Sequence, residues 1–312
     1  MTIDLSMNVG GLKLHSPLLT ASGCSGYGEE MARFDSLAPL GGIVGKSISR
    51  NPRKGNPYPR TAETAAGMLN AIGLQNEGWD SFVRGTLPMM RELTTGKGLD
   101  TKIVVNIVGH DFDEYVWLAE RVNEEKDVAA VELNLSCPNV SGGLKFSSTP
   151  EGCEELVRAV RKVLKLPLIA KLSPNVADVG EIARAAEAAG ADSLSLINTL
   201  VGMAIDWRKR KPLIANMTGG LSGPAVKPVA LRCVWQAHRA VKIPIIGIGG
   251  ICNADDALEF IVAGASAVQL GTILFVEPDA PRRVLDGIRE RLQSIGVQRL
   301  GDLVGTLQAA TP

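Results

Sequence analysis

The sequence predicts an α/β protein, a single (β/α)8 TIM barrel that spans residues 1–312 with long loops on its C-terminal face. Strand-like apolar runs alternate with helical patterns along the chain, and most are continuous in Val, Ile, Leu and Ala, as expected for strands covered on both faces. A doubly wound open sheet is the alternative, because only closure separates the two folds. The expected strands are 17–21, 42–46, 102–107, 129–135, 168–172, 193–197, 243–248 and 267–270.

Helical patterns fill the gaps between these strands. The expected helices are 112–125, 150–164, 179–189, 225–240, 254–263 and 280–293. Pro224 directly precedes the fourth helix and suits a first helical turn. Two long polar insertions, 47–76 and 198–223, follow the second and sixth strands. Structureless segments of this length are usually lids or binding loops, so we expect them to cover the active face.

Composition excludes several classes of protein. Lys and Arg together number 33, as do Asp and Glu, so no basic excess favours nucleic acid or an anionic membrane. The longest apolar runs fall far short of the roughly 20 residues that a membrane-spanning helix needs. The N-terminal residues lack the pattern of a signal peptide. We therefore expect a cytoplasmic protein with no membrane or nucleic-acid partner.

Cysteine and histidine spacing argues against metal centres and disulfides in this chain. The cysteines are odd in number and form no CxxC pair, which makes a disulfide framework or an iron–sulfur cluster bound by this chain alone unexpected. Reduced thiols fit the cytosol. The histidines His15, His110 and His238 are scattered, each is expected to be a surface or capping residue, and no metal site is predicted.

The segment 131–139 has the most chemical content. Its apolar run ends abruptly in Asn134, Leu135, Ser136, Cys137, Pro138 and Asn139. Pro138 stops the strand, and the carboxyl end of a barrel strand is where chemistry occurs. Cys137 is therefore a candidate acid or base. The alternative is a buried structural cysteine.

Polar residues also follow the other strands, and each has an ordinary explanation as a rim lysine or a turn former. A lysine inside a Val/Ile run nevertheless costs stability unless its charge has a partner. Together these residues indicate one site at the carboxyl face. They are Ser22, Lys46, Ser47, Asn106, Asn134, Lys171, Asn198, Thr199, Gly249, Gly250, Gly271 and Thr272.

The glycine-rich turns after the seventh and eighth strands predict a phosphate site, because backbone N–H groups at helix starts can point at an anion. Gly223, ahead of Pro224, could add another donor. Residues 247–252 are not a GxGxxG motif, since Cys252 occupies the third glycine position, and no Rossmann-type dinucleotide site is predicted.

Two strand-end lysines suit a flavin. A reduced flavin carries negative charge near N1 and O2, where a buried ammonium such as that of Lys171 is stabilising. The amides of Asn70, Asn134 and Asn198 carry both donors and acceptors and suit a flat ring with alternating C=O and N–H groups. A pyrimidinedione has such an edge.

These motifs identify a resemblance to the dihydroorotate dehydrogenase family that runs essentially end to end. It rests on residues 20–23, 45–47, 134–139, 171–174 and 222–224 and on the late glycine pairs. Cys137 as the base resembles soluble class 1, because the membrane-associated class carries serine there and an N-terminal anchoring extension. The segment 63–76 is similar to the NAD-linked subgroup, class 1B, rather than to the fumarate-linked one, which usually ends in Ser-Met-Gly-Leu-Pro-Asn.

The resemblance implies oxidation of dihydroorotate to orotate in pyrimidine (UMP) biosynthesis, with Cys137 removing the C5 proton and a hydride passing from C6 to N5 of FMN. It also implies an electron-transfer partner subunit that carries FAD and a 2Fe–2S cluster, in a heterotetramer of two chains of each kind. The implied substrate residues are Lys46, Asn70, Ala71, Ile72, Gly73, Leu74, Asn134, Asn198 and Thr199. The implied FMN residues are Ser22, Lys46, Ser47, Asn106, Asn134, Lys171, Ile197, Gly223, Gly249, Gly250, Gly271 and Thr272.

Other functions remain open at this stage. A fumarate-linked class 1A enzyme is one, and a dihydropyrimidine dehydrogenase-like flavoenzyme is another, although such chains usually carry ferredoxin-like cysteine motifs. Lys46 and the cations of 51–60 could meet the carboxylate that distinguishes orotate from uracil. A sugar-phosphate isomerase would not explain Cys137 with two lysines. A flavin-binding protein without activity would be yellow but would not be bleached by dihydroorotate.

Overall fold

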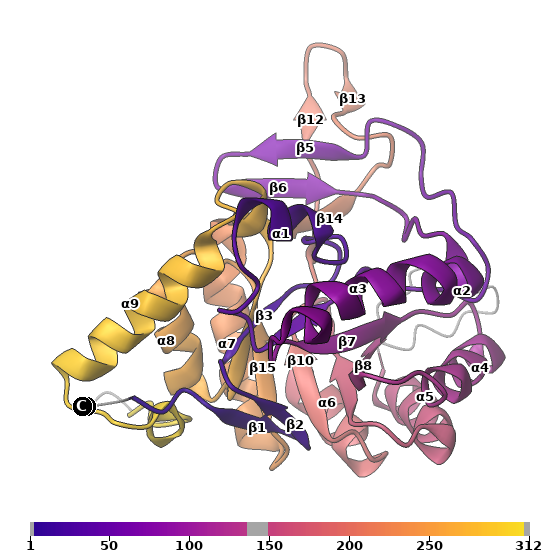
Figure 1. Cartoon of the computed structure of the whole chain (residues 1–312). Helices are drawn as coiled ribbons and strands as arrows, with labels where there is room; N and C mark the ends of the chain where they lie inside the picture. The colour runs from indigo at the N-terminus through magenta and orange to yellow at the C-terminus, as the bar shows by residue number, and fades with distance from the viewer. Residues whose placement is uncertain (1–2, 136–148, 309–312) are drawn as a thin grey trace.

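Eight parallel strands close into a barrel, and each is followed along the chain by helical structure (Figure 1). The computed structural model describes residues 3–135 and 149–308. Closure, in the order β10-β15-β16-β3-β4-β7-β8-β9, confirms the predicted barrel and excludes the open sheet. The barrel strands are β3 (Leu18–Thr20), β4 (Gly42–Val44), β7 (Lys102–Ile107), β8 (Val128–Asn134), β9 (Leu168–Lys171), β10 (Ser193–Leu196), β15 (Ile245–Ile248) and β16 (Ala267–Leu270).

Two expected strands, 102–107 and 267–270, have the predicted bounds, and the others differ by one or two residues. The differences arise where the backbone hydrogen bonds of the barrel end. Lys46, predicted to end a strand, lies beyond β4, and its backbone N–H donates to the Gly26 carbonyl at 3.2 Å. Five of the eight barrel strands are therefore shorter than the apolar runs that predict them.

The predicted helices are confirmed with small shifts at their ends, and one begins differently. Pro224–Val226 forms a separate 3₁₀ turn (η3), so the α-helix after it starts at Lys227. Side chains of Asp111, Thr149, Asp178 and Asn253 accept backbone N–H groups and define four of the starts. The helices are α4 (Phe112–Val122), α5 (Pro150–Val163), α6 (Val179–Ala188), α7 (Lys227–Ala240), α8 (Ala254–Ala263) and α9 (Ala280–Ser294).

The sequence interpretation missed the helices that follow the first two barrel strands. They are α1 (Glu29–Phe34), α2 (Gly78–Ser81), the π-helical η1 (Phe82–Thr86) and α3 (Leu87–Leu93). Trp79, Phe82, Leu87 and Met90 are buried at near-helical spacing, which is the signal that could have found this stretch. Short 3₁₀ turns complete the helical structure at η2 (Thr95–Lys97), η4 (Thr272–Phe275) and η5 (Leu300–Leu303).

The lower half of the barrel interior is apolar, and a hairpin closes it. Strands β1 (Met7–Val9) and β2 (Leu12–Leu14) pair antiparallel below the barrel (Figure 1). Buried side chains of the hairpin pack against inward residues of the barrel strands. This inner cluster consists of Val9, Leu12, Leu14, Leu19, Val44, Val104, Ala130, Ile169, Ile246 and Ala267. A larger cluster fills the space between barrel and helices.

The barrel interior becomes polar one layer further up. Side chains two residues apart share a face of a strand, so Asn106, Glu132 and Gln269 stand above Val104, Ala130 and Ala267. Asn106, Glu132 and Gln269 are at most 1% exposed. Because unpaired buried polar groups are costly, this layer requires a hydrogen-bond network.

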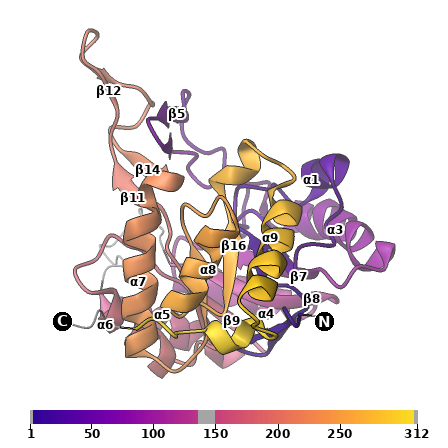
Figure 2. The same cartoon turned by 90° about the vertical axis from the view of Figure 1, so that its left-hand side faces the viewer.

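The two insertions form sheets, so their description as structureless loops was wrong. Four strands of the insertions form an antiparallel sheet. Their order is β11 (Leu200–Gly202), β14 (Gly219–Ser222), β6 (Gly67–Asn70) and β5 (Thr61–Thr64). The sheet lies above the carboxyl end of the barrel, and the small β12 (Ile205–Asp206) and β13 (Lys211–Pro212) hairpin projects beyond it (Figures 1 and 2). The pairing of β6 with β14 joins insertions far apart in sequence. In the described ranges no helix has the length and apolar character needed to cross a membrane.

Replacing Leu12 by alanine should lower the free energy of unfolding by about 2–5 kcal/mol, because this buried side chain fills the closed end of the barrel. Lys13 on the same strand is exposed, and Lys13→Ala should change stability by no more than about 0.5 kcal/mol. Urea denaturation of both variants measures the difference. Equal stability of the two would show that the hairpin is not a packed plug.

Candidate active site

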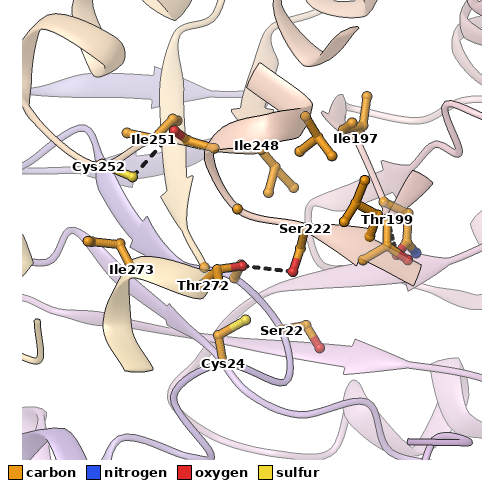
Figure 3. Close-up of a pocket in the computed structure, with 18 of the residues that line it drawn as sticks. Ser22, Cys24, Ile197, Thr199, Ser222, Ile248, Ile251, Cys252, Thr272 and Ile273 are labelled. Atoms are coloured by element: carbon orange, nitrogen blue, oxygen red, sulfur yellow. Dashed lines mark hydrogen bonds between the residues drawn. The ribbon is translucent and has the colours of Figure 1, made fainter. Parts of the chain in front are cut away.

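The carboxyl end of the barrel carries a cavity (Figure 3). Its walls come from the ends of barrel strands and from β14 of the insertion sheet. Ligands bind at this end of (β/α)8 barrels. Ten residues that the sequence predicted to bind cofactor or substrate line it: Ser22, Lys171, Ile197, Asn198, Thr199, Gly223, Gly249, Gly250, Gly271 and Thr272.

Glycine backbone forms one wall of the cavity. Gly223, Gly249 and Gly250 have φ angles of +98°, +127° and +75°, which favour glycine. A Cβ atom on Gly250 would lie 2.9 Å from the Gly223 carbonyl oxygen, and one on Gly223 would lie 2.6 Å from the Cα of Gly67. Backbone therefore packs against backbone near the starts of α7 and α8. Exposed N–H groups in such turns suit an anion such as phosphate.

A hydroxyl contact joins the last barrel turn to the insertion sheet. Thr272 Oγ1 donates to Ser222 Oγ at 2.8 Å, and both residues line the cavity (Figure 3). Ser222 ends β14, whose neighbour β6 carries Asn70. The insertion sheet thus forms part of the site, with polar groups of its own.

A chain of hydrogen bonds connects predicted site residues from four different strand ends. Ser22 Oγ lies 3.5 Å from Ser47 Oγ, and Asn134 Nδ2 donates to Ser47 Oγ at 3.4 Å. Asn198 Nδ2 in turn donates to Asn134 Oδ1 at 3.3 Å. The Tyr115 hydroxyl donates to the Asn134 carbonyl at 2.7 Å and holds the end of β8. The structure therefore brings these residues together across the mouth of the barrel.

Lys171 has the partner that its position inside an apolar strand required. Its Nζ donates to Glu132 Oε1 at 3.2 Å, and both side chains are buried. Burial disfavours the Glu132 carboxylate, but Lys171 and three neutral donors outweigh that effect and hold its pKa below the ordinary value. One of these donors is Asn106, so the structure places this predicted residue in the polar layer beneath the cavity.

Lys46 and Cys24 add two further titratable groups. Burial and the nearby Arg60 lower the pKa of the half-buried Lys46, and Glu77 partly opposes them. Cys24 lines the cavity, where burial raises the pKa of its thiol to about 11 despite the opposing charge of Lys171. Cys24 therefore stays protonated near neutral pH and is a poor base.

The structure places several predicted substrate residues in the insertion rather than in the cavity wall. Asn70 ends β6 and donates from Nδ2 to the Gly220 carbonyl at 3.3 Å. The segment 71–74 follows β6 and runs beside the loop that precedes β5. The Ala71 N–H donates to the Arg60 carbonyl at 2.8 Å, and the Asn56 N–H donates to the Ile72 carbonyl at 3.0 Å. Thr199 adjoins Gly220, which links this segment to the cavity.

Cys137 and its neighbours Ser136, Pro138 and Asn139 lie outside the described residues. The described part of the chain ends just before them, at Leu135, one residue beyond β8. The assignment of Cys137 as the base stays a prediction.

Sequence reasoning missed four polar or titratable residues of the site. Glu132 carries the buried charge beneath it, and Cys24, Ser222 and Cys252 line the cavity. Glu132 could have been predicted from the sequence, because a carboxylate inside a Val/Leu run needs a partner for the same reason that Lys171 does. Cys24 and Cys252 were considered only for cysteine pairing, and Ser222 only as part of the motif 222–224.

A closed (β/α)8 barrel with a glycine-lined, lysine-containing cavity at its carboxyl end is the arrangement expected of the class of barrel proteins that bind anionic ligands. Within this class, the family model described as dihydroorotate dehydrogenase matches residues 4–292, and the chain belongs to that family.

Curated relatives are similar over nearly their whole length. The chain is 51% identical over 306 residues to "Dihydroorotate dehydrogenase B (NAD(+)), catalytic subunit" of Phocaeicola vulgatus, covering 98% of this chain and 99% of the relative. It is 52% identical over 305 residues to the protein of the same name from Geotalea uraniireducens, covering 97% and 98%. A crystal structure of the Eimeria tenella dihydroorotate dehydrogenase in complex with ferulenol is similar with a TM-score of 0.81 at 25% identity, covering 97% of this chain and 88% of that one.

Replacing Gly250 by alanine should destabilise the protein by about 1–3 kcal/mol, because its φ of +75° is unfavourable for alanine and the new Cβ would meet the Gly223 carbonyl. Gly85 is an exposed helical glycine with open space around its Cβ position, and Gly85→Ala should be neutral or stabilising. Thermal melts of both variants test this, and matching melting temperatures would show that the turn tolerates a side chain.

Proposed function

We propose that this chain oxidises dihydroorotate to orotate in pyrimidine (UMP) biosynthesis, with FMN held at the carboxyl end of the barrel. The observation that carries the proposal is one cavity that combines a glycine backbone wall, the Lys171 ammonium and the Asn198 amide. The names of relatives at 51% and 52% identity support the same activity. They also favour the NAD-linked subgroup over a fumarate-linked enzyme or a dihydropyrimidine dehydrogenase-like enzyme.

The residues present fit FMN. The glycine turns at 223, 249, 250 and 271, together with Thr272, suit its phosphate, and Lys171 suits the negative charge of a reduced ring. Asn106 Oδ1 is a buried acceptor that has no hydrogen-bond donor among the described residues. A ring N–H is the kind of donor that would satisfy it. Ser22, Ser47, Asn134 and Ile197 complete the proposed cofactor set.

FMN, when bound, supplies a two-electron acceptor that takes a hydride at N5. The contribution of the protein is that Cys137 removes the C5 proton of dihydroorotate while C6 gives up the hydride. A thiol with an ordinary pKa of about 8.5 performs this best when its deprotonation is assisted or the pH is mildly alkaline. Asn70, Asn134, Asn198, Thr199 and the backbone of 71–74 would hold the substrate ring, and Lys46 would contact both flavin and substrate.

Electrons leave this chain through a partner. The relatives are named catalytic subunits, which implies a second subunit. We propose that the partner carries FAD and a 2Fe–2S cluster, in a heterotetramer with two chains of each kind. The five cysteines include no CxxC pair, consistent with placing the cluster in the partner. A cytoplasmic location stays part of the proposal.

Cys137→Ala should keep FMN bound but slow the bleaching of its absorbance by dihydroorotate by about 10²-fold or more, the usual scale for loss of a general base. Cys233→Ala is the matched control, because this thiol is buried in α7 among apolar neighbours. Anaerobic stopped-flow absorbance gives both rates. Near-parental bleaching of the Cys137 variant would remove this residue from the mechanism, and an equal loss in both variants would indicate a damaged fold.

The purified chain should be yellow from FMN, yet reduce NAD only when the partner subunit is added, in proportion to the complex formed. The physical reason is that the proposed route out of FMN runs through redox groups held by the partner. Steady-state oxidation of dihydroorotate is followed with NAD, fumarate and a dye as acceptors. NAD reduction by the isolated chain at the rate of the complex would contradict the NAD-linked, two-subunit assignment.

A further inference from the structure

Glu132 is a fully buried carboxylate that accepts hydrogen bonds from four other barrel strands. Lys171 Nζ and Asn106 Nδ2 donate to Oε1 at 3.2 and 2.7 Å. Ser195 Oγ and Gln269 Nε2 donate to Oε2 at 2.9 and 2.7 Å. These donors belong to β9, β7, β10 and β16, and Glu132 itself belongs to β8. The carboxylate is therefore saturated, with two donors on each oxygen.

The charge of Glu132 dictates how the two amides are turned. An ionised carboxylate only accepts hydrogen bonds, so Asn106 and Gln269 must direct their NH₂ groups toward it. Their oxygens, Asn106 Oδ1 and Gln269 Oε1, then point elsewhere, are buried, and have no donor among the described residues. A neutral residue at position 132 would no longer impose this direction.

Glu132 also supplies the counter-charge of Lys171. Lys171 lines the cavity, whereas Glu132 is 0% exposed beneath it. The Cys24 thiol also interacts with the charge of Lys171, and it stays neutral below its raised pKa of about 11. Without a partner, a buried ammonium loses its proton more easily. The carboxylate therefore keeps a positive charge at the cavity floor.

We propose that Glu132 is a positioning residue for the redox site: it holds the Lys171 ammonium and sets the direction of the Asn106 amide without itself touching the cofactor. The inference rests on the proposed binding of FMN in this cavity. A purely structural role for the network would alter stability and leave the flavin potential unchanged.

The test compares the FMN-loaded parent with Glu132→Gln, Lys171→Gln, the double variant and Ser195→Ala. Flavin potentials are measured by equilibration with a redox dye from pH 6 to 9, and a thermal melt is recorded for each protein. Ser195→Ala is the matched control, because it removes one donor from Oε2 but leaves the charge and both contacts on Oε1 in place.

The Glu132→Gln potential should fall below the parent as pH rises, because Lys171 then loses the proton that stabilises the reduced flavin. By pH 9 we expect the ratio of the affinities for reduced and oxidised FMN to drop about tenfold, which for two electrons is roughly 30 mV. Ser195→Ala should follow the parent at every pH. Adding Glu132→Gln to Lys171→Gln should shift the potential by less than Glu132→Gln shifts that of the parent, because the part of its effect that acts through Lys171 is already lost.

The proposal would be overturned if the flavin potential of Glu132→Gln followed that of the parent across this pH range and only the melting temperature of the variant fell. Full additivity in the double variant would also overturn it. If Glu132→Gln does not fold, Glu132→Asp replaces it, since it keeps the charge but withdraws it from Lys171, and its potential should shift in the same direction by a smaller amount. Failure of the parent to bind FMN would instead refute the proposed function.

Discussion

The rest of the structure depends on how one buried carboxylate is neutralised. An ionised side chain inside the barrel costs several kcal/mol unless charge and hydrogen bonds compensate it. Glu132 meets this constraint with one ammonium and three neutral donors that arrive from four other strands. Those donors reach it only when the barrel is closed and in register. The network therefore selects one arrangement of the strands, and it places a cation at the floor of the cavity.

Of the two layers of the barrel interior, the lower apolar one contributes mainly to stability and the upper polar one to the proposed function. The lower layer and the β1–β2 hairpin form a dry apolar core that gains from burial. The layer above it, with Asn106, Glu132 and Gln269, buries polar groups instead of apolar ones. It therefore gains less stability from burial but supplies fixed dipoles and a charge. Above both layers, the turns after β15 and β16 and the insertion sheet surround the cavity. Rigid backbone with polar groups directed into a cavity is the arrangement that preorganised binding requires.

Much of the candidate site could be predicted because the carboxyl ends of barrel strands converge. Ser22, Lys171, Asn198 and the glycine turns were expected together for this reason, and they line one cavity. Other features depend on contacts between distant segments. The partner of Lys171 lies 39 residues away, and the insertion sheet forms because β6 pairs with β14 across 150 residues. Local patterns carry no record of such pairings, so the insertions were taken for loops.

By itself, the sequence determined the alternation of strands and helices and the polar residues at the active end, because continuous apolar runs and strand-end chemistry are local properties. It favoured a closed barrel but left an open sheet as the alternative. The sequence motifs also showed the resemblance from which the family was predicted. Only the tertiary structure decided that Lys171 is paired with Glu132, that Cys24 is a half-buried neutral thiol beside it, and that two insertions form one sheet over the cavity. The physical reason is that charge compensation, desolvation and strand pairing depend on distances through space, which are established only when the barrel closes.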